Sequence, residues 1–423
     1  MSVHRPGAGT SRWTTLTRAG VWRRSLPGGL VTAFAFAALI AGANGVAGPG
    51  GGAPGATRAS DPEIGVATAR LASLSYPDRA SAPGCSWAVV PTPSPPANSY
   101  LRGVATRSPA DAWAVGSSTS AGGDISALIE RWNGTAWGVT SGPHVGQSSK
   151  LNAVAIVSAR NAWAVGSYEG GTPGEDTALI EHWNGAAWKR ASIPHPGAIS
   201  WLNAVAVVSW RNAWAVGGYA DTAGGHDKTF IEHWNGREWK RALTPTVMIP
   251  LSAVTAISWR NAWAVGYVRG EQPRDVIMHW NGRGWKRVAY SHPAGGSLLS
   301  GVAAVSWRDV WAVGSTTLQT SAGRALVEHW NGRNWKRVPT PDAGSGVLTA
   351  VAAVSSRNAW ALGGGDSQGD SSIQHWNGTN WRGESSPGLG GTSGVAASSA
   401  RNVWAVGSYD NATNDFTFAV HCG

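Results

Sequence analysis

Histidine recurs with a fixed neighbour in this chain of 423 residues: six times it stands directly before a tryptophan or, at the last copy, a cysteine. Imidazole is the commonest side-chain ligand of transition metals, so regularly spaced histidines could build a metal site. Equivalent positions of a repeat, however, lie on different structural units and do not converge. We therefore predict structural histidines, hydrogen-bonded between strands, and no metal and no cofactor. They are His182, His233, His279, His329, His375 and His421.

Groups suited to nucleophilic catalysis occur, but not in a catalytic arrangement. Ser158, His182 and Asp176 would supply the members of a triad, yet each is a repeat position and Ser158 does not lie in a G-x-S-x-G phrase. The pair His226–Asp227, in a glycine-rich loop, comes nearest to an acid and histidine cluster that breaks the repeat. No calcium loop of the D-x-[DN]-x-[DN]-G kind is found. The sequence predicts no catalytic residues and a protein that is not an enzyme.

Aromatic side chains are the better candidates for function, as ligand contacts. The chain has 26 tryptophans, of which 20 belong to a repeated pattern and are expected to be core. Exposed tryptophan is a frequent anchor of binding surfaces, so the additional tryptophans are contact candidates. Four tyrosines that shortly follow the A-V-G phrase of the repeat are candidates as well. The predicted ligand-binding residues are Trp201, Trp210, Trp259, Trp307, Tyr168, Tyr219, Tyr267 and Tyr409.

The repeat that positions these residues is marked by three series of tryptophans. One lies in an A-W-A-V-G-like phrase and recurs every 44 to 51 residues: Trp113, Trp163, Trp214, Trp263, Trp311, Trp360 and Trp404. A second lies in H-W-N-G, or in R-W-N-G at its first copy: Trp132, Trp183, Trp234, Trp280, Trp330 and Trp376. The third follows the second by five residues: Trp137, Trp188, Trp239, Trp285, Trp335 and Trp381. Self-similarity at this period indicates a propeller or a solenoid.

One repeat unit predicts four strands. Its inner strand is expected over Leu151–Val157, its second over Ala162–Val165 and its third over Ala178–Trp183, with the outer strand around Trp188. An Asn-Gly pair between two strand-like runs is a strong signal for a two-residue hairpin, so Asn184-Gly185 is predicted to form one.

The two ends of the chain complete the ring. Cys85 to Val89 matches an outer strand, Phe418 to Cys422 matches a third strand, and together they make a seventh hairpin beside six complete ones. In the aligned W-N-G-x-x-W pattern, Cys422 takes the first Trp position and Cys85 lies two residues before the second. Opposed residues of neighbouring strands lie within disulfide range, so we predict a Cys85–Cys422 disulfide in place of the Asn-Gly turn. Two unpaired thiols are the alternative.

The unit resembles a kelch-type blade, with its apolar inner strand, glycine after the second strand and aromatic hairpin. More closely, it resembles the W-N-G-repeat propellers, secreted bacterial proteins of unassigned function. The resemblance covers residues 85–423 and implies an all-β, seven-bladed propeller with four antiparallel strands per blade. Fucose-type propeller lectins also carry a W-[DN]-G-x-x-W hairpin, with Arg, Glu and Trp converging on a sugar. This chain repeats Arg160, Glu181 and Trp, but places the arginine in a turn.

A four-stranded blade presents different turns on the two faces of the ring. We call the side with the S-x-R-N turns and N-G hairpins the hairpin face, and the side with the second-to-third and outer-to-inner connections the loop face. Connections on the loop face vary in length and hold 12 of the 24 acidic residues, whereas the hairpin face gathers arginines. Variable loops on a rigid scaffold predict that the loop face binds the ligand. Four Lys-Arg pairs on the outer strands fit either polyanion binding or protection of exposed strand edges: Lys189-Arg190, Lys240-Arg241, Lys286-Arg287 and Lys336-Arg337.

The N-terminal residues have the pattern of an export signal. Residues 1–47 contain five arginines and no acid, and the arginines precede an apolar run from Leu30 to Ala41 that small residues follow. We expect residues 1–47 to be a signal peptide, 48–84 a flexible lead-in and 85–423 the propeller. Without those arginines the net charge falls from +10 to +5, which weakens a nucleic-acid interpretation.

The sequence as a whole predicts a secreted, monomeric binding propeller. Its partner is expected to be a protein or a cell-surface glycan, with no nucleic acid and no membrane span after signal cleavage. A multivalent carbohydrate-binding lectin, a polysaccharide-acting enzyme and a purely structural role are the alternatives.

Overall fold

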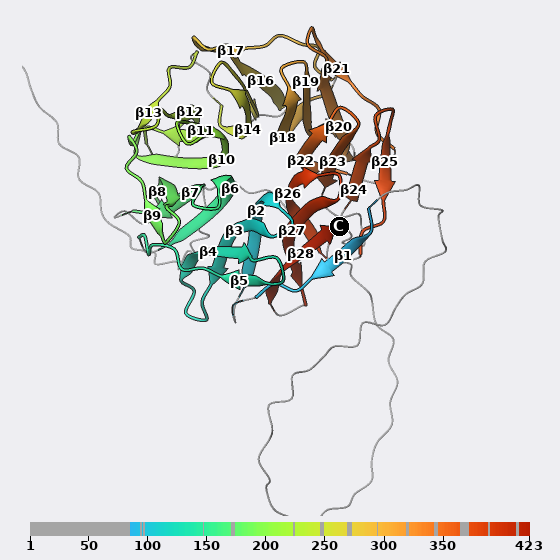
Figure 1. Ribbon diagram of the computed structural model, residues 1–423. Coiled ribbons are helices and arrows are strands. Elements are labelled where there is room, and N and C mark those ends of the chain that lie inside the picture. The colour runs from blue at the N-terminus through green and yellow to red at the C-terminus, as the bar shows by residue number, and fades with distance from the viewer. Residues whose placement is uncertain are drawn as a thin grey trace, which may run out of the picture. The chain divides into compact units, whose positions relative to one another are not determined.

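The computed structural model describes residues 85–423, except 94, 96–97, 147, 171–173, 223–224, 246–248, 269–272, 294, 319–320, 342–345, 364–371, 388–389 and 412–413. The described residues form 28 strands and no helix, arranged as seven four-stranded antiparallel sheets around a central axis (Figure 1). The chain is a seven-bladed β-propeller, as the repeat predicted. The expected signal peptide and lead-in lie outside the described residues.

The blades follow one another around the ring in sequence order. Blade 1 holds β2 (Ser99–Ser108), β3 (Asp111–Thr119), β4 (Ile125–Trp132) and β5 (Trp137–Val139), and blade 2 holds β6 (Ser149–Ser158), β7 (Asn161–Glu169), β8 (Asp176–Trp183) and β9 (Trp188–Arg190). Blade 3 holds β10 (Ile199–Ser209), β11 (Asn212–Ala220), β12 (Lys228–Trp234) and β13 (Trp239–Arg241), and blade 4 holds β14 (Leu251–Ser258), β15 (Asn261–Val268), β16 (Arg274–Trp280) and β17 (Trp285–Arg287). Blade 5 holds β18 (Ser297–Ser306), β19 (Asp309–Leu318), β20 (Ser321–Trp330) and β21 (Trp335–Arg337), and blade 6 holds β22 (Leu348–Ser355), β23 (Asn358–Gly363), β24 (Ser372–Trp376) and β25 (Trp381–Glu384). Blade 7 holds β26 (Gly391–Ser399), β27 (Asn402–Asp410), β28 (Asp415–Cys422) and, from the other end of the chain, β1 (Trp87–Val90).

The strands are longer than their apolar cores. In blade 2 the second strand runs to Glu169 and the third begins at Asp176, beyond the predicted limits at Val165 and Ala178. Backbone pairing continues past the apolar residues, down to the Glu169–Asp176 pair at the turn. Apolar pattern therefore located each strand but understated its length.

Tryptophans fill the wedges between blades, as predicted. Trp163 of β7 is 2% exposed and meets both hairpin tryptophans of blade 3, with ring centroids 4.9 Å from Trp234 and 5.1 Å from Trp239. The Trp163 and Trp239 rings meet nearly edge-on, at 88°. The same three-tryptophan contact joins blades 1–2, 3–4, 4–5, 5–6 and 7–1. This contact is the repeated packing interaction between neighbouring blades.

The hairpin between third and outer strands differs from the two-residue turn that we predicted. Trp183 pairs directly with Trp188, so residues 184–187 form the connection. Gly185 has a φ of 96°, and the side-chain oxygen of Asn184 accepts the backbone N–H groups of Ala186 and Ala187 at 3.0 Å each. The asparagine thus caps the turn with its side chain, and the glycine supplies the positive φ.

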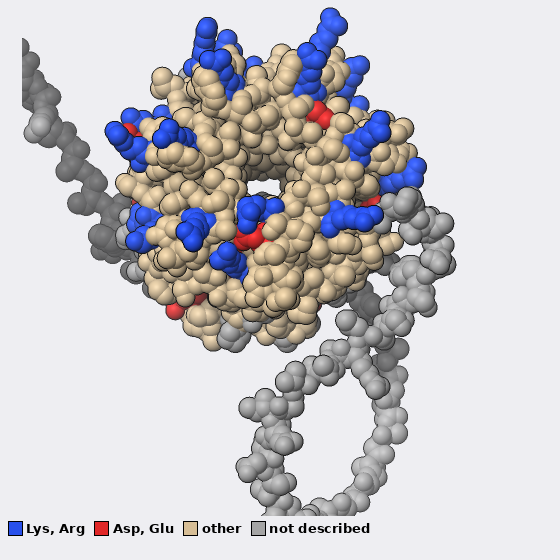
Figure 2. All heavy atoms as spheres, in the orientation of Figure 1, with Lys and Arg blue, Asp and Glu red and all other residues tan. Residues whose placement is uncertain are grey.

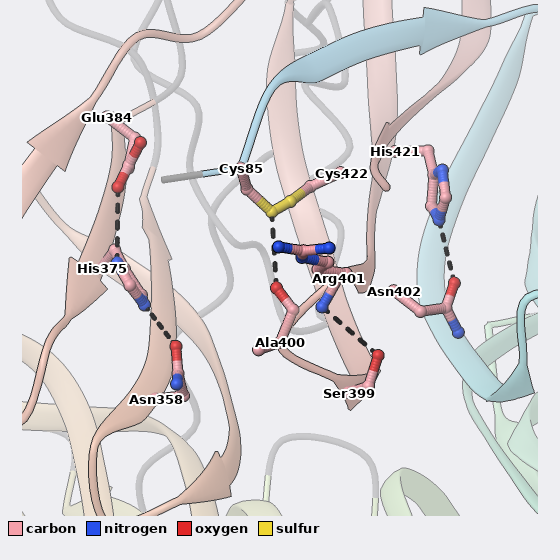
Figure 3. Close-up of a disulfide and its surroundings, with 10 residues drawn as sticks. All are labelled: Cys85, Asn358, His375, Glu384, Ser399, Ala400, Arg401, Asn402, His421 and Cys422. Atoms are coloured by element: carbon pink, nitrogen blue, oxygen red, sulfur yellow. Dashed lines mark hydrogen bonds and ion pairs between the residues drawn. A yellow bond between two sulfur atoms is a disulfide. The ribbon is translucent and has the colours of Figure 1, made fainter. Parts of the chain in front are cut away.

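The ring closes by the predicted route. β1, blue in Figure 1, pairs with β28, red, so that Trp87 stands opposite Cys422. Cys85 and Cys422 form the disulfide, with Cα atoms 5.3 Å apart (Figure 3). We had expected Cys85 to oppose Cys422 directly, but Cys85 lies two residues before Trp87, which is the residue opposite Cys422. The bond therefore reaches diagonally across the turn position.

No helix long and apolar enough to cross a membrane occurs among the residues that the structure describes.

Loss of the disulfide is expected to open the ring at blade 7. The bond joins residues 337 apart, and the chain-entropy model assigns such a cross-link about 5 kcal/mol of stabilisation. A Cys85→Ser, Cys422→Ser double variant should show a clearly lowered unfolding midpoint in guanidinium chloride. Reductant should shift the wild type in the same direction and leave the variant unchanged. Intact mass should first confirm that the wild type contains the disulfide and that the variant does not. Equal unfolding midpoints for the two proteins would then contradict a stabilising role of the disulfide.

Candidate functional site

In blades 2 to 6 the turn that holds the arginine is fixed to the N-G hairpin of the same blade by a hydrogen bond from the hairpin tryptophan and by packing of the arginine stem on the hairpin glycine. In blade 4 the indole Nε1–H of Trp280 donates to the carbonyl oxygen of Trp259, 3.0 Å away. The Ser258 hydroxyl accepts the N–H of Arg260 at 3.3 Å. A Cβ at Gly282 would lie 2.8 Å from Cγ of Arg260, so only glycine allows the arginine stem to lie against the hairpin. The second tryptophan series therefore has a specific task, which is to hold this turn.

The bond from the indole to the turn carbonyl recurs in blades 1 to 6, at 2.8 to 3.1 Å. Because it uses a backbone carbonyl, it places no demand on the side chain at position x. That side chain is Pro109, Ala159, Trp210, Trp259, Trp307, Ser356 and Ala400 in blades 1 to 7. In blade 7, Cys422 replaces the donor tryptophan, and the disulfide sulfur of Cys85 lies 3.7 Å from the Ala400 carbonyl oxygen (Figure 3).

Three consecutive blades use position x for an exposed tryptophan. Trp210, Trp259 and Trp307 are 55%, 57% and 52% exposed. The next residue is an arginine whose guanidinium lies 4.0 Å from the centre of the indole ring in each case. A cation over an exposed ring gains about 0.5–1 kcal/mol, enough to orient both groups.

The same three blades carry a second arginine, at the third position of the N-G hairpin. Arg237, Arg283 and Arg333 occupy this position in blades 3, 4 and 5, whereas blades 1, 2 and 6 have Thr135, Ala186 and Thr379. In blade 4, Trp259, Arg260 and Arg283 line one hollow together with the N-G turn. Tryptophan and second arginine thus occur together or not at all. We call the nine residues of blades 3–5 the Trp–Arg arc: Trp210, Arg211, Arg237, Trp259, Arg260, Arg283, Trp307, Arg308 and Arg333.

Positive charge surrounds the Trp–Arg arc. The side of the ring in Figure 2 shows lysine and arginine spread over the blades around the central opening, with few acidic groups between them. Two acids lie next to arc residues, and both are paired: Glu238 with Lys240 at 2.9 Å and Asp309 with His329 at 2.8 Å. The arc is therefore a positive surface with aromatic rings in it.

The repeated histidines are structural, as predicted. His182 Nε2 lies 3.2 Å from Asn161 Oδ1, and its ring lies against Trp163 with centroids 4.2 Å apart. The same pair with the turn's Asn or Asp occurs in blades 3, 5, 6 and 7, although in blade 4 His279 Nε2 has no hydrogen-bond partner. Burial lowers the pKa of His182, which keeps it neutral. Among the described residues no cluster of three His, Cys, Asp or Glu could hold a metal ion.

Glutamates of the third strands are buried between blades and do not face a ligand. Glu130, Glu181 and Glu232 are fully buried, and their carboxylate oxygens have no hydrogen-bond partner. Burial raises the pKa of each to about 8, so they are mostly protonated at neutral pH. Glu181 lies beside Gly142 of the preceding connection, whereas Arg160 packs on Gly185 of the hairpin. The Arg, Glu and Trp of the lectin-like pattern are therefore not brought together here.

The four tyrosine candidates are half-buried, and Tyr168, Tyr219 and Tyr409 contact other side chains of the chain. The guanidinium of Arg190 lies 4.4 Å from the Tyr168 ring centre, and that of Arg241 lies 4.5 Å from Tyr219. Tyr409 stacks on Phe416, and Tyr267 is half-buried on β15. These contacts involve the arginines of two Lys-Arg pairs in packing at the blade edge.

Trp201, the remaining tryptophan candidate, packs closely on Gly218, where a Cβ would lie 2.6 Å from its ring and 2.9 Å from Pro250. It is half-buried, in contrast to the three tryptophans of the arc. Its ring fills space beside β11 and the start of blade 4.

A cluster that breaks the repeat lies between blades 4 and 5, and the sequence interpretation missed it. Asp275 is fully buried, its Oδ1 lies 2.5 Å from His292 Nδ1, and its Oδ2 has no hydrogen-bond partner. The Tyr290 ring lies 4.5 Å from the His292 ring, and burial beside Asp275 raises its pKa. The available signal was that Asp275 stands where the equivalent strands have Ala127, Ala178, Thr229 or Ala325.

The pair His226–Asp227, which came nearest to such a cluster in the sequence, is not part of it, and His226 is exposed. The chain has one sequence of the G-x-S-x-G form, Gly365 to Gly369, and it lies outside the described residues. Acids of the loop face are engaged locally: Asp176 binds Lys150 at 2.8 Å, and Asp221 and Asp415 bind Lys228 and Tyr100.

No family model and no curated protein sequence matches the chain. Solved structures match in fold. The structure of YCF48 bound to D1 peptide is 13% identical, covers 81% of this chain and 100% of its own, with a TM-score of 0.53. YCF48 from Cyanidioschyzon merolae is 16% identical over 79% of this chain and 98% of its own, with a TM-score of 0.50. The GH74 xyloglucanase from Xanthomonas campestris is 15% identical over 77% of this chain and 54% of its own, also at 0.50. These similarities establish the propeller fold.

The buried glutamates predict a stability that falls as pH rises. A pKa of about 8 in the folded chain, against 4.5 in the unfolded chain, means that only the unfolded chain loses this proton between those values. Glu181→Gln should leave stability unchanged near pH 4 and raise it toward pH 8, with a ceiling of about 1.4 kcal/mol per pH unit. Chemical denaturation across pH 4–9 measures this, and Gln374, the equivalent residue of blade 6, shows that an amide fits. Glu238→Gln, at an exposed carboxylate, is the control and should leave the pH profile unchanged.

Proposed function

We propose that this protein is a non-catalytic binding propeller whose ligand docks on the Trp–Arg arc. The observation that carries the proposal is the joint occurrence of tryptophan and second arginine in blades 3, 4 and 5 alone. The turn itself accepts alanine, serine or proline at that position, so packing within the blade does not require the indole. Aromatic and arginine side chains are the residues enriched at the energetic centres of interfaces.

We place the ligand on the hairpin face rather than on the loop face expected from the sequence. The candidates Trp201, Tyr168 and Tyr219 have close contacts within the chain, whereas Trp210, Trp259 and Trp307 are more than half exposed. A half-buried ring with an internal partner has less surface to offer a ligand.

The remaining parts of the proposal come from the sequence. The chain is proposed to be a secreted monomer of the W-N-G-repeat kind, with residues 1–47 removed on export, and to act on its partner by binding without catalysis. A protein or a cell-surface glycan is the proposed partner class.

Removal of the three indoles tests the arc. The variant Trp210→Ala, Trp259→Ala, Trp307→Ala gives blades 3–5 the side chain that blade 2 has at Ala159, so it should fold and keep the wild-type unfolding midpoint. Its binding on an array of neutral and acidic glycans should be at least about thirtyfold weaker than that of the wild type, the effect of losing one aromatic anchor. A pull-down from cell-surface extract, compared between the same two proteins, extends the test to protein partners.

Two single variants make the comparison specific. Arg357→Ala removes the equivalent arginine of blade 6, outside the arc, and should bind as the wild type does. Trp201→Ala should also keep binding. Binding that is lost in Trp201→Ala but kept in the triple variant would place the ligand on the loop face, and the absence of any arc-dependent partner in both assays would overturn the proposal.

A further inference from the structure

We infer that the ligand of the Trp–Arg arc is a linear anionic polysaccharide with a carboxylate on successive sugar rings. The inference rests on the proposed function and specifies its ligand. It follows from the composition of one module, from the repetition of that module and from the charges around it.

One module combines a flat apolar surface with a forked cation. In blade 4 the Arg260 guanidinium lies 4.0 Å from the indole centre of Trp259, and Arg283 lines the same hollow from the N-G hairpin. The indole is still 57% exposed, so a large part of it remains open to solvent. The C–H face of a sugar ring suits such an aromatic surface, and guanidinium pairs with carboxylate in a bidentate geometry. A uronic acid residue presents both groups on one unit.

The turn arginine of each module is held in place before any ligand arrives. The stem of Arg260 lies against Gly282, its backbone N–H donates to Ser258 Oγ, and its head stacks on Trp259. Arg211 and Arg308 have the same contacts with Gly236 and Gly332. A cation that is already ordered loses little conformational entropy on binding, which favours affinity.

Repetition points to a polymer. The module occurs on three neighbouring blades at the same place in each, so the three lie in sequence along one arc of the hairpin face. A ligand with repeating units can occupy neighbouring modules at once, and each further contact is then intramolecular. A compact ligand would need one module, and the other two would have no role.

Charge separates this ligand from neutral glycans. Each module brings two arginines, and the acids next to the arc, Glu238 and Asp309, are already paired with Lys240 and His329. The arc therefore sets six arginines against two neighbouring acids, which leaves it positively charged as a whole. Neutral polysaccharide would satisfy the indoles but leave six arginines unused.

Single-stranded nucleic acid is the other repeating polyanion that stacks on aromatic rings. The polysaccharide is favoured because the N-terminal segment has the pattern of an export signal, and polymers with a carboxylate on each sugar are components of cell surfaces. The two differ in the test below.

The test compares four immobilised polymers by biolayer interferometry with the full chain. Polygalacturonate has both rings and charge, dextran has rings alone, poly-L-glutamate has charge alone, and poly(dT) has bases and phosphate. We expect binding to polygalacturonate that is at least about tenfold tighter than to the other three, and that falls with added salt. The triple tryptophan variant should lose at least about thirtyfold in affinity for polygalacturonate.

A gain-of-binding variant makes the prediction independent of folding defects. Blade 2 already has Arg160 packed on Gly185, and it lacks only the indole and the second arginine. Ala159→Trp with Ala186→Arg extends the arc to four neighbouring modules and should tighten polygalacturonate binding about tenfold. For a matched comparison, Ala159→Trp alone is set against Ala400→Trp, which lies at the same turn position beside Arg401 in blade 7. Ala400→Trp adds an indole away from the arc and should leave affinity unchanged.

Four results would overturn the inference. Equal binding of poly-L-glutamate would reduce the arc to a charge effect, preference for poly(dT) would assign it to nucleic acid, and equal gains from the single variants of blade 2 and blade 7 would remove the role of adjacency. Absence of polygalacturonate binding, while another array ligand still depends on Trp210, Trp259 and Trp307, would refute this ligand class and leave the proposed function standing.

Discussion

The contact of one tryptophan with the hairpin of the next blade is the interaction on which the rest of the structure depends. Trp163 reaches Trp234 and Trp239 together, at centroid distances of 4.9 and 5.1 Å. Both partners must keep their positions across a turn, so the spacing of five residues between them is the same in all six complete copies. The packing between blades thereby fixes the length and the composition of the hairpin within each blade.

The hairpin then fixes the turn beside it. Trp234 donates to a backbone carbonyl, and Gly236 leaves room for the stem of Arg211. Since neither contact involves the side chain before the arginine, that position can change in one blade without affecting its neighbours. The residue at this position therefore differs between blades while the length of the turn stays the same. The Trp–Arg arc consists of such changes in adjacent blades.

Much of this architecture could be predicted from the sequence because it is periodic. The repeat located the strands, the number of blades, the closure by β1 and the Cys85–Cys422 bond, and it separated core tryptophans from additional ones. Contacts between non-equivalent residues could not be predicted. Asp275 and His292 come together where blades 4 and 5 meet. Trp201 is half-buried, unlike Trp259, because it packs beside Gly218 and Pro250, and the spacing of the repeat does not predict these neighbours.

The split blade has a consequence for the order of events during synthesis. β1 is the first of the described strands to be synthesised, yet its partner β28 is the last of them. Blades 1 to 6 each complete from contiguous sequence, whereas blade 7 requires the final strand. The native partner of β1 is therefore absent until more than 300 further residues have been synthesised, and blade 7 is complete only when β1 and β28 pair. β1 is thus synthesised before the other described strands and is the last to find its partner.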